Sequence, residues 1–168
     1  MRPTRVLDAL NSQAAMEPIL IQGWVRTRRD YQGFSFVEVN DGSCLKNLQV
    51  VVEDPIPASE NFTLVTTGAA VAVQGALIPS RGKGQKWEVK ATQVTLLGGA
   101  DPATYPLQKK AQSDEFLREN GHLRPRTNKY GALFRIRSES AFAVHKFFRE
   151  RGFYYIHTPI ITLSLIHI

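Results

Sequence analysis

The stretch that decides the fold is residues 19–40, ILIQGWVRTRRDYQGFSFVEVN. It begins apolar and then alternates, and after a turn-forming segment at 30–33 the alternation resumes across 34–40. Apolar and polar residues that alternate with a period of two indicate a strand with one face against a core. The stretch therefore predicts two strands, residues 19–26 and 34–40, joined as a hairpin.

Further strand-like segments follow at residues 48–52, 71–78, and 87–91 together with 94–97. Residues 58–65, between the third and fourth strands, are compatible with a short helix. Five short strands with one helix in that place is the element order of the OB-fold, a partly open barrel whose strands 2 and 3 bind oligonucleotides. Gly23 and Gly75 lie inside strands, where glycine permits the bend that closing a barrel requires. We predict an OB-fold barrel at residues 18–98, preceded by an N-terminal extension at 1–17.

A change of pattern at Gly98-Gly99-Ala100-Asp101-Pro102 ends the barrel and begins a polar, basic hinge at residues 99–127, with a short helix near 113–119. A long helix is predicted from Asn128, with Gly152 as the residue that ends it. A mainly apolar pattern recurs every three or four residues, at Leu133, Ile136, Ser140, Ala143 or Val144, and Phe147. Residues 153–161 are predicted to form a strand that Pro159 stops or kinks. A small barrel cannot bury an apolar stripe of this length, so something larger is expected to cover it.

Charge is unevenly distributed along this +6 chain. Residues 1–97 carry 10 Lys and Arg against 9 Asp and Glu, whereas residues 98–168 carry 11 against 6. Such an excess favours a phosphate backbone as partner, although a solvated basic helix face is the alternative. The one cysteine, Cys44, allows no internal disulfide, and no segment has the length of a membrane span or the pattern of a secretory signal. A cytoplasmic setting is expected, with an organelle matrix or stroma as the alternative.

Motifs for catalysis are missing from the chain: it has no phosphate-binding P-loop, no nucleophile elbow and no HExxH pair. The four histidines are at least ten residues apart and have no ligand partner at metal-binding spacing, so no metal site is expected. The glycine-rich tip at residues 81–84 could cradle a phosphate or simply be a basic hairpin turn.

The first hairpin carries a more specific pattern. Its first strand ends in Arg26, Arg28 and Arg29, just before Phe34 and Phe36 on the second strand. Proteins that bind single-stranded nucleic acid combine cations along the backbone with exposed aromatic rings on which bases stack. In the alternative interpretation the two phenylalanines are barrel core and the arginines a solvated edge. The residues by themselves leave both open.

Several motifs resemble one family of enzymes. Residues 23–30 (GWVRTRRD), 36–42 (FVEVNDG) and 48–51 (LQVV) resemble the anticodon-binding barrel of class IIb aminoacyl-tRNA ligases, which handle aspartate, asparagine and lysine. Residues 105–110 (YPLQKK), 115–118 (EFLR) and 122–127 (HLRPRT) are similar to the hinge of bacterial and organellar asparagine–tRNA ligases. Residues 147–153 (FFRERGF) with 157–162 (HTPIIT) resemble class II motif 1, which assigns residues 128–162 to the start of an α/β catalytic domain. Residues 163–168 depart from the pattern, which we interpret as a truncation or an artefact.

The resemblance implies roles for individual residues. Phe36 matches the ring that stacks on the central anticodon uridine, Gln49 the position that hydrogen-bonds this base, and Glu88 an acidic position at a base edge. The strand carrying Arg26, Arg28 and Arg29 is expected to contact phosphates. RNA loops are read in this way, by stacking and by hydrogen bonds to splayed bases. Motif 1 implies a homodimer interface, to which four residues are assigned: Phe147, Gly152, Phe153 and Pro159.

The resemblance also implies an activity for the whole enzyme. Such a ligase activates asparagine with ATP and Mg²⁺ and transfers it to tRNA(Asn), as a homodimer without membrane association. The arginines of motifs 2 and 3 that hold the phosphates are absent from this sequence, so this chain is expected to be inactive alone, with no catalytic residue and no bound ATP or metal. The alternatives are a fragment of an aspartate or lysine enzyme, which the hinge disfavours, and a stand-alone OB-fold that binds single strands. Residues 128–162 favour a ligase, because a stand-alone barrel has no use for them.

Overall fold

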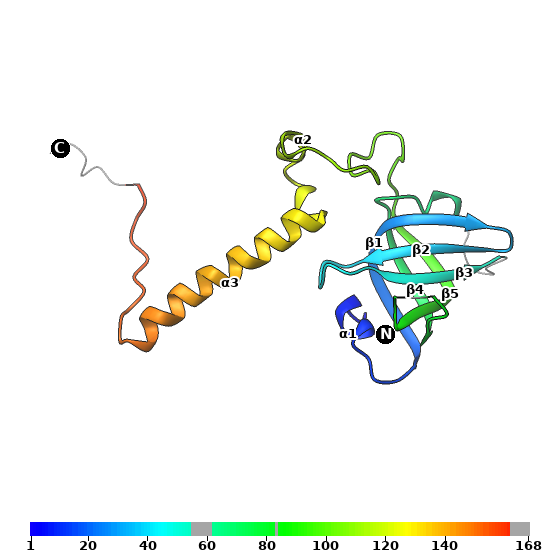
Figure 1. Ribbon diagram of the computed structural model, residues 1–168, viewed down its shortest axis with the longest axis horizontal. Helices are drawn as coiled ribbons and strands as arrows, with labels where there is room; N and C mark the ends of the chain where they lie inside the picture. The colour runs from blue at the N-terminus through cyan, green and yellow to red at the C-terminus, as the bar shows by residue number, and fades with distance from the viewer. Residues whose placement is uncertain (55–61, 83, 162–168) are drawn as a thin grey trace.

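The computed structural model describes residues 1–54, 62–82 and 84–161, and it consists of a barrel, a hinge and one long helix (Figure 1). The strands are β1 (Met16–Tyr31), β2 (Phe34–Asn40), β3 (Leu48–Glu53), β4 (Ala70–Pro79) and β5 (Trp87–Gly98). The helices are α1 (Val6–Leu10), α2 (Asp114–Glu119) and α3 (Asn128–Glu150), with 3-10 turns η1 (Phe62–Leu64) and η2 (Arg124–Arg126). The predicted mainly β fold with a five-stranded OB-fold barrel is confirmed.

The barrel closes in the order β1-β2-β3-β5-β4, with β4 returning to β1. Only β3 and β5 run parallel among these pairs. The long strand β1 pairs with β4 through its first half and with β2 through its second, which requires it to bend. At Gly75, β4 and β5 shift register and approach so closely that a Cβ would collide with the carbonyl oxygen of Lys90. The predicted role of this glycine in closing the barrel is confirmed.

Alternation along β2 determines what faces the core. Ser35, Val37 and Val39 are buried, whereas Phe34 and Phe36 between them are only partly buried on the outer face. The inside is filled mainly by branched aliphatic side chains such as Val37 and Val39, which suit a pleated, tightly curved sheet. The alternative in which the two phenylalanines form the core is therefore excluded.

The N-terminal extension contributes to the barrel core. Val6 and Ala9 of α1 are fully buried against it. The start of α1 is capped from a distant loop: Asp41 accepts a hydrogen bond from the Val6 N–H at 2.9 Å, and the Ser43 hydroxyl accepts one from the Leu7 N–H at 3.0 Å. The core therefore begins before residue 18, where the sequence pattern places the start of the barrel.

The hinge holds a small apolar cluster of its own, built from Leu107, Leu117 and Leu123. The short helix predicted near residues 113–119 is α2, and the Ser113 hydroxyl caps it by accepting a hydrogen bond from the Phe116 N–H. Of the helix predicted at 58–65, residues 58–61 lie outside the described residues, and η1 covers Phe62–Leu64.

The long helix α3 extends away from the barrel (Figure 1). Thr127 caps its start, and Gly152, at a φ of 81°, ends it in a Schellman motif in which the Phe153 N–H donates to the Phe148 carbonyl. These ends agree with the prediction. Its apolar positions are exposed, with Ile136 67% accessible and Phe147 49%. The barrel does not cover the stripe, as expected.

The strand predicted at residues 153–161 is wrong. The segment has no strand assignment, and Tyr154 and Ile160 are each 91% exposed. A strand exists through hydrogen bonds to a neighbouring strand. Among the described residues no strand lies beside this segment.

Candidate nucleic-acid interface

The outer face of the barrel brings the predicted base-reading residues onto adjacent strands. One row across the sheet pairs Arg29 of β1 with Phe36 of β2, and Phe36 with Val51 of β3. The next row pairs Glu38 of β2 with Gln49 of β3, and Gln49 with Glu88 of β5. Paired residues share a face, and diagonal neighbours on it lie within reach of an aromatic ring. Phe36 and Gln49 are such diagonal neighbours.

The Phe36 ring belongs to a cluster of three aromatic side chains. It meets Phe34 edge-on at a centroid distance of 5.2 Å and Tyr31 at 5.7 Å. These contacts hold the Phe36 ring from one side, while its partial exposure leaves ring surface in contact with solvent. A ring fixed in this way can accept the flat face of a base with little loss of side-chain freedom.

Glu88 is the centre of a buried polar network. Only 5% of it is exposed, and its Oε2 accepts hydrogen bonds from Gln49 Nε2 at 3.1 Å, from the Ser80 hydroxyl at 2.8 Å and from Gln85 Nε2 at 3.4 Å. An ionised carboxylate only accepts hydrogen bonds, so it fixes the amide nitrogen of Gln49 towards itself. The carbonyl oxygen is then the end of the Gln49 amide that Glu88 does not bind.

The three predicted arginines separate into different environments. Arg29, with 47% of its side chain exposed, lies on the outer face and forms an ion pair with Glu38 at 3.1 Å. Arg28 pairs with the buried Val37 instead; it donates to the carbonyl of Phe62 at 2.6 Å and stacks on the Phe62 ring at 4.2 Å. Only Arg29 of these two lies beside the aromatic ring proposed to bind a base.

Arg28 is also held by an acidic partner. Asp30 binds the Arg28 guanidinium at 2.7 Å and accepts a hydrogen bond from the Ser35 hydroxyl at 2.6 Å. The Ser35 hydrogen bond, and then the Arg28 guanidinium, lower the pKa of Asp30 against the opposing effect of burial. The carboxylate therefore stays ionised and keeps Arg28 inside the fold.

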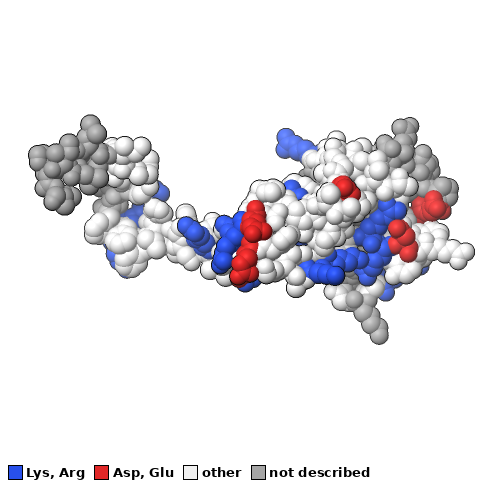
Figure 2. All heavy atoms as spheres, turned by 90° about the horizontal axis from the view of Figure 1, so that it is seen from above, with Lys and Arg blue, Asp and Glu red and all other residues white. Residues whose placement is uncertain are grey.

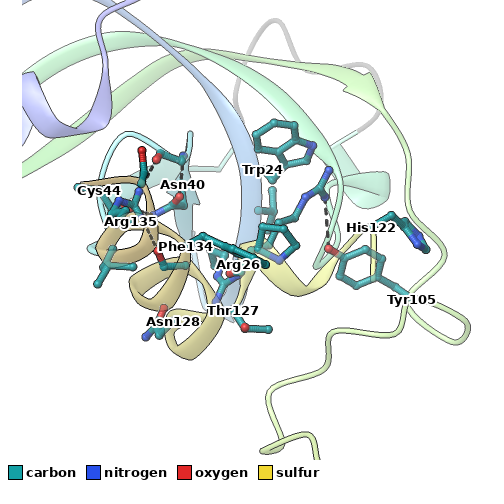
Figure 3. A pocket seen from close by; sticks show the side chains of 17 residues that line it. Trp24, Arg26, Asn40, Cys44, Tyr105, His122, Thr127, Asn128, Phe134 and Arg135 are labelled. Atoms are coloured by element: carbon teal, nitrogen blue, oxygen red, sulfur yellow. Dashed lines mark hydrogen bonds between the residues drawn. The ribbon is translucent and has the colours of Figure 1, made fainter. Parts of the chain in front are cut away.

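A cavity of about 530 Å³ lies where the barrel meets the hinge and α3 (Figure 3). Arg26 donates a hydrogen bond to the carbonyl of Arg126, whose guanidinium stacks on Trp24 at 4.3 Å and reaches the Tyr105 hydroxyl at 3.4 Å. Arg135 likewise donates to backbone carbonyls, including that of Gly42. Since these cations are already engaged with the protein, the cavity is a junction that positions the hinge rather than an anion site.

The residues assigned to motif 1 lie at the end of α3 remote from the barrel (Figure 1). Arg151 stacks on Phe147 at 3.6 Å, and Phe148 meets the ring of Phe153 at 5.4 Å. Phe153 and Pro159 are exposed. The structure therefore keeps the two groups of predicted residues apart.

The surface charge is mixed. Figure 2 shows basic side chains gathered over the barrel with acidic ones beside them, and basic and acidic side chains side by side where the narrow arm meets the body. Among the described residues no three His, Cys, Asp or Glu side chains lie close enough together to hold a metal ion. No described helix has the length and apolar character needed to cross a membrane.

Two residues of the site escaped sequence reasoning, Ser80 and Gln85. They flank the turn between β4 and β5 and hydrogen-bond to Glu88 and to each other. The glycine-rich tip noted in the sequence belongs to this turn, of which residue 83 lies outside the described residues. Serine and glutamine beside a turn carry no signal of their own, because such residues are common in turns.

Comparison with known proteins shows what the barrel and the chain resemble. Residues 19–97 match the family model for the tRNA anticodon region that is described as an OB-fold nucleic acid binding domain. Over 164 residues, 98% of its length, the chain is 62% identical to asparagine–tRNA ligase of Nitratidesulfovibrio vulgaris strain DP4. The resemblance to asparagine–tRNA ligases is confirmed. The same name belongs to a relative from Synechocystis, 54% identical over 98% of the chain. The chain spans 36% of the length of each of these two ligases.

Solved structures agree with the asparagine–tRNA ligase likeness at the level of the fold. The chain superposes on asparaginyl-tRNA synthetase from Pyrococcus horikoshii with a TM-score of 0.82 at 18% identity, over 96% of this chain and 38% of that one. Aspartyl tRNA synthetase from Entamoeba histolytica gives 0.73 at 18% identity, over 94% and 39%. The shared fold thus includes an aspartyl enzyme, and at 18% identity these two structures show the fold alone.

Proposed function

We propose that this chain is the anticodon-reading part of an asparagine–tRNA ligase. The observation that carries the proposal is the partly exposed Phe36 ring on the outer face, next to Arg29 and diagonal to the Gln49–Glu88 pair. An unpaired base stacks on Phe36, a contact worth roughly 1–3 kcal/mol. The likeness to asparagine–tRNA ligases supports tRNA(Asn), with its GUU anticodon, as the RNA.

The hydrogen-bonding groups favour uracil at the central position. Glu88 holds the Gln49 amide nitrogen, so the Gln49 oxygen accepts the N3–H of a uracil stacked on Phe36. A cytosine places an acceptor nitrogen at the same point, which leaves two acceptors facing each other. Arg29 contributes a cation at the edge of this site, where it pairs with the loop phosphate and shares its charge with Glu38.

The proposal extends to the ligase as a whole. The ligase uses ATP with Mg²⁺ to activate asparagine, acts in the cytoplasm and forms a homodimer through the motif 1 residues Phe147, Gly152, Phe153 and Pro159. The described residues offer no ligand set for Mg²⁺, so the proposal assigns this chemistry to no residue of this chain. The exposed apolar positions of α3 support a partner surface for that helix, which a stand-alone single-strand binder does not need.

The test compares two RNA stem-loops that differ only in the central anticodon base, GUU and GCU. We expect the chain to bind the GCU loop roughly 5- to 150-fold more weakly, because an unsatisfied polar contact costs about 1–3 kcal/mol. Kd values are measured by fluorescence anisotropy at one salt concentration, since phosphate contacts depend on salt. Equal affinities would refute base reading and leave a barrel that binds single strands without sequence preference.

A further inference from the structure

The hairpin between β1 and β2 ends in a pair of stacked aromatic rings. Tyr31 and Phe34 are cross-strand partners, and their rings lie 5.2 Å apart at an interplanar angle of 12°. The turn that carries them is tied to the end of β3, since the Asp54 N–H donates to the Gly33 carbonyl at 3.0 Å. Of the Tyr31 side chain and backbone together, 53% is exposed. The ring pair is thus preformed and open to solvent.

These rings have no part in the barrel core. The buried cluster contains neither Tyr31, Phe34 nor Phe36. A single exposed aromatic side chain is ordinary, whereas three in contact on one face form an apolar patch that calls for a ligand. The hairpin tip lies at the end of the barrel opposite α3, where the hinge and helix do not cover it (Figure 1).

The ring pair continues the surface proposed to read the anticodon. Tyr31 and Phe34 lie one ladder step, two residues or roughly 7 Å, beyond the Arg29–Phe36 pair on the same outer face. Phe34 also contacts the Phe36 ring directly. A strand of RNA whose base rests on Phe36 therefore passes close to Tyr31 with its next nucleotide.

The charges around the tip favour a base over a phosphate. Asp30, Glu53 and Asp54 are near neighbours of the tip in sequence or pairing. Asp30 is engaged by Arg28 and Ser35, and Glu53 by Lys90 at 3.0 Å. A phosphate would meet these carboxylates, while the uncharged face of a base would not.

We propose that the Tyr31–Phe34 ring pair is a second stacking platform, which takes the unpaired base next to the one on Phe36. The inference rests on the proposed function, because it uses the same bound loop. Its ligand is the face of a flanking anticodon-loop base, recognised by stacking and not by sequence.

The test uses Tyr31→Ala and Tyr31→Phe in the full chain, with Phe142→Ala on exposed α3 as the matched control. The probes are the GUU stem-loop and two versions that lack the base on one or the other side of the central uridine. We expect Tyr31→Ala to weaken binding of the intact loop roughly 5- to 150-fold, and Tyr31→Phe and Phe142→Ala to leave it within twofold. The abasic loop that lacks the base stacked on Tyr31 and Phe34 should bind wild type and Tyr31→Ala equally well, because it has no base for the ring pair to contact.

Different outcomes separate the two proposals. Normal binding by Tyr31→Ala, with the GUU and GCU loops still distinguished, would overturn the second platform and leave the proposed function standing. If Tyr31→Ala lost the same amount of affinity for the intact loop and for both abasic loops, the substitution would disturb the hairpin in general. That result would also overturn the second platform. Failure of wild type to distinguish GUU from GCU would instead refute the proposed function.

Discussion

Replacing Glu88 by glutamine tests how the barrel chooses the central base. The carboxylate is 5% exposed and accepts hydrogen bonds from Gln49, Ser80 and Gln85. Glutamine has the same shape but can donate as well as accept, so it no longer dictates which end of the Gln49 amide faces the base. Stacking on Phe36 remains.

The size of the effect follows from that exchange. A hydrogen bond to a charged group is worth about 1.5–3 kcal/mol and a neutral one about 0.5–1.5 kcal/mol, so Glu88→Gln removes about 1 kcal/mol of orienting energy from Gln49. We expect the ratio of Kd values for the GCU and GUU loops to fall about fivefold, and most of that change to be weaker binding of GUU.

The assay measures both Kd values for wild type, Glu88→Gln and Glu53→Gln by fluorescence anisotropy. Glu53→Gln removes one negative charge from the edge of the same face, where the carboxylate pairs with Lys90 at 3.0 Å rather than with Gln49. It should raise the affinity for both loops equally and leave their ratio unchanged. A Glu88→Gln variant that folds normally and keeps the wild-type ratio would refute the orienting role of Glu88.

Three further predictions concern Asp41, Arg28 and Arg29. Asp41→Ala should lower the free energy of unfolding by about 0.5–2 kcal/mol, measured in urea, because the Val6 N–H loses its cap. Burial raises the pKa of Asp41, but hydrogen bonds from Ser43 and Val6 outweigh burial and lower the pKa overall, so this stabilisation is complete above the ordinary aspartate pKa and is lost as the pH falls through the lowered value. A constant difference in stability between variant and wild type down to strong acid would contradict the cap. Arg28→Ala should lower the melting temperature because the side chain binds the Phe62 carbonyl and Asp30. Arg29→Ala should instead reduce the salt dependence of RNA binding by about one phosphate contact. The reverse pattern would show that Arg28 is the phosphate ligand.

Much of the barrel could be predicted because the alternation of apolar and polar residues shows which face of a strand is exposed to solvent. The predicted strand at 34–40 coincides with β2, and the glycine that closes the barrel, Gly75, could be recognised inside its strand. The ends of β1 could not be predicted. The pattern places this strand at residues 19–26, whereas β1 runs from Met16 to Tyr31 and is followed by a turn of only two residues. Local pattern marks the middle of a strand better than its limits.

The environment of polar residues required the structure. Arg28 and Arg29 are adjacent and chemically identical, yet one lies inside the fold and the other on the reading face, because register is set by pairing across strands. Glu88 looks like a surface residue in an alternating strand and is in fact buried by partners from two other segments.

The same limit applies at the ends of the chain. Val6–Leu10 is too short to be stable as an isolated helix and depends on caps supplied from 35 residues away. Residues 153–161 have the composition of a strand but no strand beside them among the described residues. In both places the deciding partner is distant in sequence.

The measurement that bears most directly on the account is the affinity of Phe36→Ala for the GUU stem-loop, set against Phe142→Ala, which removes an equally large ring from exposed α3. We predict that Phe36→Ala binds roughly 5- to 150-fold more weakly than wild type and that Phe142→Ala binds as wild type does. A folded Phe36→Ala variant with wild-type affinity would contradict the claim that the outer face of the barrel receives an unpaired base.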